Sequence, residues 1–300
     1  MNEDVRSKLK ASSSGQSMRK RQSPKRKASK KKEQAPKPTV EILPIEYETQ
    51  AIEETANVLF KPNKGPQTDF LAAAEREVLY GGSAGGGKSY AMLADPLRYM
   101  GHPAFSGLLL RHTTEELREL VFKSQELYPK IWPGIKWSER KMQWTAPSGA
   151  RLWMSYLDRE DDVLRYQGLA FSWIGFDELT QWASPFAWNY MRSRLRSTAP
   201  DLPIFMRATT NPGGRGHHWV KKMFIDPAPA GKAFNATDIE SGEDLKYPAG
   251  HEKAGKSLFK RRFIPARLSD NPYLSKQGDY EAMLLSLPEQ QRRQLLDGDW

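Results

Sequence analysis

Short apolar runs alternate with mixed polar and apolar stretches along the middle of the chain. The runs at residues 78–80, 106–111, 171–176 and 204–209 consist largely of bulky apolar residues, so we expect each to be a buried strand. Helices are expected at 68–76, at 90–97 and from Thr113 or Thr114 to Phe122. Strands that alternate with helices at this spacing predict an α/β fold, with a mostly parallel sheet and helices on both faces.

Local signals set the ends of these elements. Thr68 or Asp69 is expected to cap the first helix, and Pro96 is expected to kink or shorten the second. In the third helix, Glu116 stands three residues after Thr113, in the position of a capping box. Residues 136–144 and 150–157 flank a Pro-Ser-Gly turn, and this pattern predicts a pair of strands.

The excess of positive charge lies in the N-terminal segment. Residues 1–38 contain thirteen Lys or Arg residues and three acidic residues, and the net charge of the whole chain is +10. This segment has too little apolar surface to fold, so we expect a disordered basic arm at 1–38. The arm either binds nucleic-acid phosphates or is a solvated tail without a specific partner. Residues 39–240 are expected to form the core domain, and residues 241–300 a smaller linker or lid subdomain.

Several classes of protein are excluded by what the sequence lacks. It contains no cysteine, which excludes disulfides and zinc sites with cysteine ligands. No apolar run approaches the roughly 18 residues that a membrane span needs. The basic N-terminus is not followed by an apolar segment, so it does not match a secretory signal. We therefore expect a cytoplasmic protein with no membrane partner.

A glycine-rich turn follows the first strand. It fits the spacing G-x-x-x-x-G-K-[ST] and lies between an apolar strand and a helix, as that motif requires. Glycine lets backbone N–H groups approach a polyphosphate closely, the lysine reaches its β- and γ-phosphates, and the serine hydroxyl holds Mg²⁺. The pattern predicts a nucleoside triphosphate site, and the alternative is a glycine-rich turn that matches by chance. The expected contact residues are Gly82, Ser83, Ala84, Gly85, Gly86, Gly87, Lys88, Ser89 and Tyr90.

Two adjacent carboxylates, Asp177 and Glu178, follow the apolar run at 171–176. Successive residues at a strand end point in different directions, so one side chain can face a metal ion while the other faces a water molecule. We expect Asp177 and Ser89 to bind Mg²⁺, and Glu178 to be the catalytic base, with Lys88 as a second catalytic residue. The alternative is that the two carboxylates belong to an ordinary exposed turn.

Small polar residues end another of the predicted strands. Thr209, Thr210 and Asn211 stand before a Pro-Gly turn. Hydroxyl and amide groups gain or lose a hydrogen bond when a γ-phosphate leaves, so these three are candidate γ-phosphate sensors. Gln67, fifteen residues before Gly82, is a candidate for pairing with the edge of adenine through its side-chain amide. The alternatives are an ordinary turn for the three sensors and an ordinary helix start for the glutamine.

A cation that stabilises the transition state of phosphoryl transfer contributes about 10³–10⁵ in rate. Arg165 lies in a polar segment ahead of the strand that leads to Asp177, and it is the first candidate for such an arginine finger. Arg111 at the end of its strand is the second, and either arginine could instead form a surface ion pair. The adjacent His217 and His218 are not expected to bind metal, because neighbouring side chains diverge and no carboxylate stands at ligand spacing.

These motifs recur together and in a fixed order in one family. They are GSAGGGKS at 82–89, LRHT at 110–113, YQG at 166–168, GFDELT at 175–180 and TNPG at 210–213. Three later segments agree, namely FIPAR at 263–267, DNPY at 270–273 and LLDGDW at 295–300. From about Pro62 to Trp300 the chain resembles the ATPase portion of the large terminase subunit of tailed bacteriophages.

The resemblance implies a phosphate-loop NTPase of the RecA/ASCE type that hydrolyses ATP with Mg²⁺ and drives double-stranded DNA into a procapsid. Family members work in the host cytoplasm as rings on the portal protein, together with a terminase small subunit. In such a ring Arg165 would act on the nucleotide of a neighbour, Gln67 would contact adenine, and residues 209–211 would be the coupling motif. Family members continue into a ribonuclease-H-like nuclease domain, which these 300 residues do not include.

Two other functions remain compatible with the motifs. One is another DNA-dependent phosphate-loop ATPase such as a helicase, although the sequence contains only one set of motor motifs. The other is an adaptor that binds nucleotide together with DNA or a capsid and does not hydrolyse it.

Overall fold

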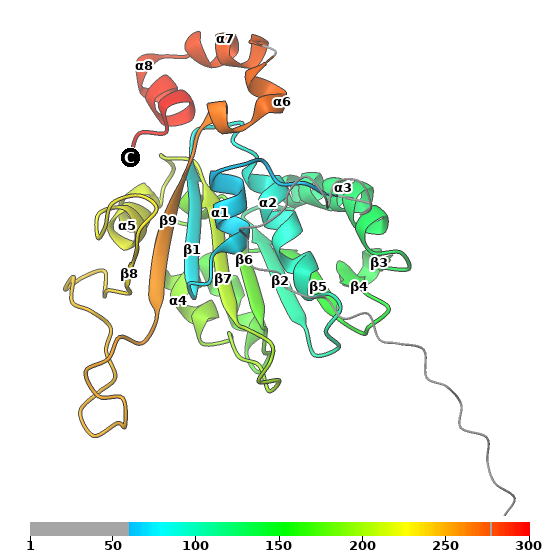
Figure 1. Cartoon of the computed structure of the whole chain (residues 1–300), viewed down its shortest axis with the longest axis vertical. Coiled ribbons are helices and arrows are strands. Elements are labelled where there is room, and N and C mark those ends of the chain that lie inside the picture. The colour runs from blue at the N-terminus through cyan, green and yellow to red at the C-terminus, as the bar shows by residue number, and fades with distance from the viewer. Residues whose placement is uncertain (1–59, 277) are drawn as a thin grey trace, which may run out of the picture. The chain divides into compact units, whose positions relative to one another are not determined.

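A mixed β-sheet forms the centre of the described part of the chain (Figure 1). The computed structural model describes residues 60–276 and 278–300, and the predicted arm at 1–38 lies outside them. Within these residues nine strands pair in the order β3-β4-β5-β2-β6-β7-β1-β9-β8. Every neighbouring pair from β5 to β9 is parallel, whereas β3, β4 and β8 add antiparallel pairs at the two edges.

The four apolar runs predicted as strands are confirmed as neighbouring strands of the parallel part of this sheet. Their side chains are buried almost throughout, as expected for strands that are covered on both faces. The strands of the sheet are β1 Glu77–Gly82, β2 Ser106–Arg111, β3 Lys136–Ser138, β4 Gln143–Thr145, β5 Arg151–Tyr156, β6 Trp173–Asp177, β7 Phe205–Thr210, β8 Ala233–Asn235 and β9 Lys260–Ala266.

Helices lie on both faces of the sheet, which confirms the predicted fold class. The α-helices are α1 Pro66–Ala72, α2 Lys88–Ala94, α3 Thr114–Ile131, α4 Phe186–Arg192, α5 His217–Val220, α6 Pro272–Ser275, α7 Asp279–Leu285 and α8 Glu289–Arg292. Short 3₁₀ segments are η1 Asp95–Tyr99, η2 Glu139–Lys141, η3 Glu160–Tyr166, η4 Leu179–Gln181 and η6 Leu268–Asp270, and π-helical turns are η5 Lys221–Ile225 and η7 Arg293–Asp297.

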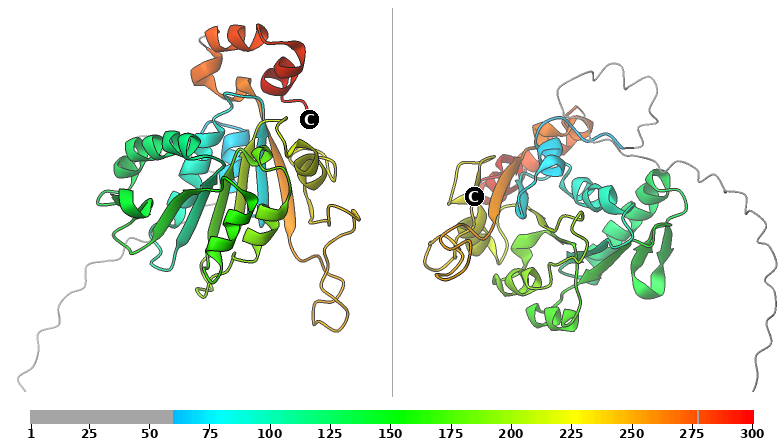
Figure 2. Two further views of the ribbon diagram at one scale, coloured as in Figure 1. Left: turned by 180° about the vertical axis from the view of Figure 1, so that it is seen from behind. Right: turned by 60° about the horizontal axis from the view of Figure 1, so that its bottom comes forward.

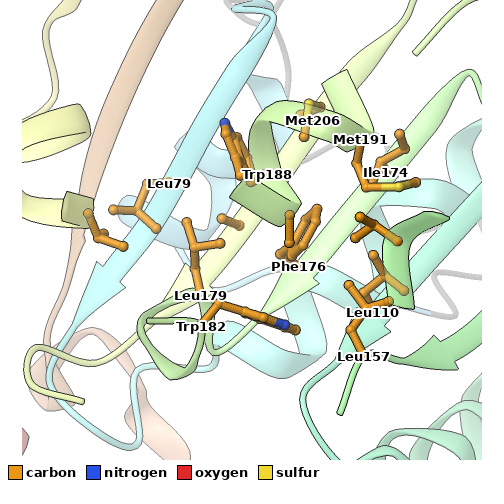
Figure 3. Close-up of a cluster of buried hydrophobic side chains, with 14 of the residues drawn as sticks. Leu79, Leu110, Leu157, Ile174, Phe176, Leu179, Trp182, Trp188, Met191 and Met206 are labelled. Carbon is orange, nitrogen blue, oxygen red and sulfur yellow. The ribbon is translucent and has the colours of Figure 1, made fainter. Parts of the chain in front are cut away.

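Alternation along each central strand divides the core between the two faces. The ribbon views show α4 on one face of the sheet and α1 and α2 on the other (Figure 2). Leu79 of β1 packs in one cluster with residues of α4 and α5, whereas its neighbours Val78 and Tyr80 pack in another with residues of α1. In β6, Phe176 contacts Trp182 and Trp188 on the α4 face (Figure 3). On the opposite face a second cluster joins the strands to α2 and α3. The sheet is thereby held rigidly, with the ends of its parallel strands fixed in space.

Several helix boundaries differ from the predictions. The first helix ends at Ala72 and not at residue 76, and the second spans Lys88–Ala94 and not 90–97, with Pro96 in the 3₁₀ segment that follows it. The first helix begins at Pro66 after Gly65, so the predicted caps Thr68 and Asp69 lie inside it. Proline suits the first position of a helix because its φ is already helical and it lacks an N–H group. Thr113 does cap α3, and its Oγ1 accepts a hydrogen bond from the Glu116 N–H at 3.3 Å. The predicted end of that helix at residue 122 is wrong. The helix continues to Ile131, and its buried residues extend to Tyr128.

Two strand predictions also need correction. The run at 136–144 is not one strand: it forms β3 and β4, which are separated by η2 and by Met142 in a left-handed conformation. The antiparallel pair around the Pro-Ser-Gly turn is therefore β4 with β5. β9 was not predicted as a strand, yet it lies beside β1 and belongs to the segment expected to form the smaller subdomain. Its Pro265 lies beyond the end of β8, where its missing N–H group costs no pairing on that side.

A buried ion-pair network joins the beginnings of β1 and β9. Glu77 is fully buried, accepts a hydrogen bond from Arg261 Nε at 2.7 Å and also pairs with Arg192. Arg261 is 1% exposed. Burial alone would raise the pKa of the Glu77 carboxyl, but the two arginines outweigh this effect and lower it. The carboxylate therefore stays charged and neutralises a guanidinium that has no access to water.

Replacing Glu77 with Gln is expected to lower the free energy of unfolding by about 3–5 kcal/mol at neutral pH, because Arg261 is left as an unpaired buried charge. Urea unfolding monitored by circular dichroism measures the change. The control is Glu119→Gln, which removes an exposed pair with Lys123 and is expected to cost no more than about 0.5 kcal/mol. A similar small loss in both variants would contradict the structural role given to Glu77.

Candidate functional site

The glycine-rich turn connects β1 to α2 at the carboxyl end of the parallel strands. Gly82 has a φ of 143°, and a Cβ atom there would lie 2.2 Å from the carbonyl oxygen of Ala266 in β9. Gly87 has a φ of 79°, and a Cβ atom there would lie 2.8 Å from the side-chain nitrogen of Gln67. Both positions exclude a side chain, so glycine is required where the loop packs against β9 and against Gln67.

Lys88 places a buried cation directly under the loop. Its side-chain Nζ donates to the Ser83 carbonyl at 2.6 Å and to Asn211 Oδ1 at 2.7 Å. Burial lowers the pKa of this ammonium, and the nearby carboxylates of Glu178 and Asp177 act in the opposite direction. The lysine therefore reaches across from the phosphate loop to the end of β7.

Asp177 ends β6 at the floor of the site. Thr209, its partner in the register of β7, donates its hydroxyl hydrogen to Asp177 Oδ1. The other oxygen lies 3.0 Å from Arg111 Nε, but within the described residues neither atom has a hydrogen-bond partner. This buried oxygen is ion-paired with Arg111 but receives no hydrogen bond, so it keeps a lone pair that a water molecule or a cation could use.

Glu178 stands beside this aspartate in a strained backbone conformation. Its φ is 61°, which is left-handed and costly for a residue other than glycine. The Asn211 N–H donates to Glu178 Oε2 at 3.3 Å. Burial raises the pKa of this carboxyl, the charge of Asp177 raises it further, and Lys88 and Arg111 oppose the rise. The strain turns the side chain away from that of Asp177 and towards the end of β7.

The three predicted sensor residues have three different partners. β7 lies between β6 and β1, so its end adjoins both the acidic pair and the phosphate loop. Thr209 contacts Asp177, Asn211 contacts Lys88, and the Thr210 hydroxyl lies 2.7 Å from that of Thr180. Thr180 belongs to η4, which follows the acidic pair. The end of β7 thus links the acidic pair, the lysine and the loop after β6.

A cavity of about 380 Å³, called here the nucleotide cavity, lies in front of the phosphate loop. Five of the residues predicted in the phosphate loop, the acidic pair and the sensors do not line this cavity. Four of them are fully buried, namely Ser83, Asp177, Thr209 and Thr210, and the fifth, Gly82, is the last residue of β1. The lining residues that were predicted from sequence are Ala84, Gly85, Gly86, Gly87, Lys88, Ser89, Tyr90, Arg111, Glu178 and Asn211. Those that were not predicted are Glu119, Lys123, Asn271, Leu274 and Tyr280.

A more apolar cavity of about 560 Å³ adjoins the first and shares Gly87, Tyr90, Asn271 and Leu274 with it. Gln67 lines this second cavity. The glutamine's Oε1 accepts from Asn63 N at 2.6 Å, and its Nε2 donates to the Gly87 carbonyl at 2.9 Å. One donor and one acceptor of the amide therefore already bind the chain itself.

The two candidate arginine fingers lie in different surroundings. Arg111 lines the nucleotide cavity and contacts Asp177. Arg165 does not line either cavity: its Nη2 donates to the Tyr156 carbonyl at 3.0 Å, and its guanidinium pairs with Asp162. Arg111, the second candidate, therefore lies in the site of its own chain, and Arg165, the first candidate, does not.

The chain beyond β9 supplies site residues that sequence reasoning did not assign. Asn271 caps α6 and donates from Nδ2 to the Gly85 carbonyl at 2.6 Å. The Ala84 N–H donates to the Leu295 carbonyl at 2.7 Å. An Asn before Pro272 is a recognisable helix start, so the cap was readable from the sequence, but its position over the phosphate loop depends on where β9 ends.

The described residues contain no ready-made metal cluster and no membrane span. No group of three His, Asp or Glu side chains is placed to hold a metal ion by itself, and no helix is long and apolar enough to cross a membrane. His217 accepts a hydrogen bond from the Gly213 N–H at 2.9 Å and stacks on Trp300. A Mg²⁺ site with one carboxylate and one hydroxyl ligand is compatible with this result, since Mg²⁺ commonly keeps water and phosphate ligands.

The fold and the phosphate loop define a phosphate-loop NTPase of the ASCE-like class, as predicted. The family model described as "Terminase large subunit, T4likevirus-type, N-terminal" matches residues 79–300, and the chain belongs to this family. The predicted family is thus confirmed. Among curated proteins, none matches the chain.

Solved structures of large terminases have a similar fold. A mutant of the large terminase ATPase domain of Thermus phage P74-26 has a TM-score of 0.52 at 13% identity, covering 80% of this chain and 95% of that one. The large terminase of a second, thermophilic bacteriophage has a TM-score of 0.58 at 16% identity, covering 80% of this chain and 54% of that one. The complex of that terminase with ATP-γ-S gives 0.53 at 15% identity, covering 80% and 53%. The chain thus spans about half the length of the thermophilic phage protein.

Proposed function

We propose that this chain is the ATP-hydrolysing motor of viral DNA packaging, which couples ATP hydrolysis to movement of double-stranded DNA into a procapsid. The observation that carries the proposal is the convergence of Lys88, Glu178 and Asn211 on one cavity in front of the phosphate loop, with Asp177 buried next to Glu178 and paired with Arg111 of the lining. Membership of the terminase large-subunit family supplies the biological setting. The large terminase of the thermophilic bacteriophage, which has the same fold, has been solved with ADP and with ATP-γ-S.

The residues at the site fit a magnesium–nucleotide complex. Ser89 and Asp177 would hold Mg²⁺, because the unsatisfied Asp177 oxygen and the serine in the first turn of α2 provide oxygen ligands. When bound, the ion would neutralise phosphate charge. Residues Gly82 to Ser89 would surround the phosphates, with Lys88 at the γ-phosphate. The base would lie in the adjoining cavity between Tyr90 and Gln67, where the glutamine keeps one N–H and one lone pair free for adenine.

Glu178 would take the proton of the attacking water. A base is most effective when its pKa lies near the working pH, and burial moves this carboxyl in that direction. Asn211 would hold the base through its N–H while its side chain competes with the γ-phosphate for Lys88. Loss of the γ-phosphate would change the hydrogen bonds of Asn211, and Thr209 and Thr210 would pass this change to Asp177 and to Thr180 in the loop after β6.

The rate of ATP hydrolysis is expected to fall on acidification with a midpoint above 4.5, the ordinary value for a glutamate. The base acts only when deprotonated, and its raised pKa moves that protonation step to higher pH. Steady-state rates at saturating Mg·ATP measure the profile, and circular dichroism at each pH separates loss of activity from unfolding. Full activity at pH 4.5 in a folded protein would contradict the role of Glu178.

The chain after β7 would transmit hydrolysis to DNA. We divide the whole chain into an ATPase core at 39–240 and a linker or lid subdomain at 241–300. Hydrogen bonds from Asn271 to Gly85 and from Ala84 to Leu295 connect this subdomain to the phosphate loop and support such coupling. The partners would be the portal, the procapsid and a terminase small subunit in the host cytoplasm, with residues 1–38 available for DNA phosphates.

Arg165 is proposed to act on the nucleotide of a neighbouring subunit in a ring, because it lies outside the nucleotide cavity of its own chain. Replacing Arg165 with Ala is expected to abolish hydrolysis, and mixing this variant with Glu178→Gln protein is expected to restore part of it. Restoration follows because a mixed ring contains interfaces with an intact base on one side and an intact arginine on the other. Absence of rescue at concentrations where rings form would assign Arg165 a role within its own subunit, and Arg111 would then be the finger.

Steady-state ATP hydrolysis with and without linear double-stranded DNA tests the proposed function. A packaging motor is expected to hydrolyse ATP faster when DNA is present and to leave the duplex intact. Strand separation in a parallel assay would favour the helicase, and ATP binding without hydrolysis would favour the adaptor.

A further inference from the structure

A third cavity borders Glu178 and contains no residue of the phosphate loop in its lining. It has a volume of about 390 Å³ and is called here the side cavity. At about 30 Å³ per water molecule, it has room for a phosphate ion with part of its hydration shell. The residues that matter for its chemistry are His112, Glu178, Gln181, Asn211, Gly213 and Arg215.

The nucleotide cavity and the side cavity share a wall. Glu178 and Asn211 line both, and the hydrogen bond from Asn211 N to Glu178 Oε2 at 3.3 Å closes the wall between them. Asn211 is also the residue bound to Lys88 Nζ, the group placed to contact the γ-phosphate. A phosphate ion released beside Lys88 would therefore lie against this wall, and only Glu178 and Asn211 would separate it from the side cavity.

The chemistry of the side cavity favours an anion. Arg215 is exposed, and within the described residues it has no carboxylate partner and no ring contact. His112 adds a ring N–H group. Glu178 is the one carboxylate among the described lining residues, and its Oε2 is held by the Asn211 N–H in the wall. Arg215 is the one arginine or lysine among the described lining residues, so it is the group that would attract an anion into the cavity.

We propose that the side cavity is the exit route of inorganic phosphate, with Arg215 as the cation that draws the ion through the wall formed by Glu178 and Asn211. The inference rests on the proposed function, since it concerns the product of ATP hydrolysis. The route leads away from the phosphate loop, so phosphate leaves without passing the bound ADP.

The test separates chemistry from release in the full chain. Single-turnover hydrolysis is followed by rapid quench, and phosphate appearance by a fluorescent phosphate-binding reporter. For Arg215→Gln the hydrolysis step is expected to stay within about twofold of wild type, while release slows about tenfold. Added inorganic phosphate should also inhibit this variant more weakly. Because the guanidinium is exposed, raising the salt concentration should slow release in the wild type and have little effect in the variant.

Two further variants complete the experiment. Arg215→Lys keeps the charge and is expected to restore release. Arg140→Gln removes an exposed arginine in η2, beside the β3 edge of the sheet, and is expected to behave as wild type. Equal slowing of hydrolysis and release in Arg215→Gln would overturn the inference and place the arginine in the chemical step, and unchanged release would overturn it as well. A wild-type chain that binds ATP without hydrolysing it would overturn the proposed function together with the inference.

Discussion

Replacing Glu178 with Gln is expected to leave ATP binding intact and to lower the rate of hydrolysis by about 10²–10⁴-fold, the contribution of a positioned general base. The amide keeps the size of the side chain and can still accept the hydrogen bond from Asn211 N, but it cannot take a proton from water. Binding is measured with a fluorescent ATP analogue, and hydrolysis as phosphate produced under single-turnover conditions.

Glu119 provides a matched control for this substitution. It lines the same nucleotide cavity and is paired with Lys123 on the exposed side of α3, away from the acidic pair. Glu119→Gln should therefore hydrolyse ATP within about twofold of wild type. Hydrolysis that persists in Glu178→Gln at more than one-tenth of the wild-type rate would show that another group activates the water.

Replacing Lys88 with Ala is expected to weaken ATP binding by about tenfold or more and to lower hydrolysis at least about 100-fold. The ammonium is the buried cation of the site, and its present partners, a carbonyl and an amide oxygen, are positions that phosphate oxygens would take over. Titration of the fluorescent analogue and single-turnover hydrolysis measure the two effects.

Lys123 is the corresponding control, since it lines the cavity but is only half-buried and is already paired with Glu119. Lys123→Ala is expected to change ATP affinity less than threefold. Equal losses in the two lysine variants would mean that general positive charge, and not the position of Lys88 under the loop, determines binding.

Much of the site could be predicted because its chemistry is local in sequence. The glycine pattern at 82–89 needs a strand before it and a helix after it, and both follow from the apolar runs next to it. The same reasoning placed Asp177, Glu178 and Asn211 at strand ends. Parallel strands bring their carboxyl ends to one edge of the sheet, so these residues could be expected to meet.

The parts that sequence reasoning missed depend on contacts between distant segments. β9 contains Pro265, which normally argues against a strand, and it is tolerated because the outer edge has no partner at that point. Asn271 reaches the phosphate loop only because β9 ends beside Gly82. Sequence reasoning ranked Arg165 ahead of Arg111, yet only Arg111 lines the nucleotide cavity of its own chain, since the position of η3 relative to the sheet is set by packing and not by a local signal.

The central claim is that one triphosphate and its magnesium are held between the phosphate loop and the acidic pair. A crystal structure of the chain with ATP-γ-S and Mg²⁺ tests it most directly. The account predicts the thiophosphate within hydrogen-bond distance of Lys88 Nζ, in place of Asn211 Oδ1, with the ion between Ser89 and Asp177. Nucleotide bound elsewhere, or bound at the loop with its terminal phosphate turned away from Asp177 and Glu178, would contradict the account.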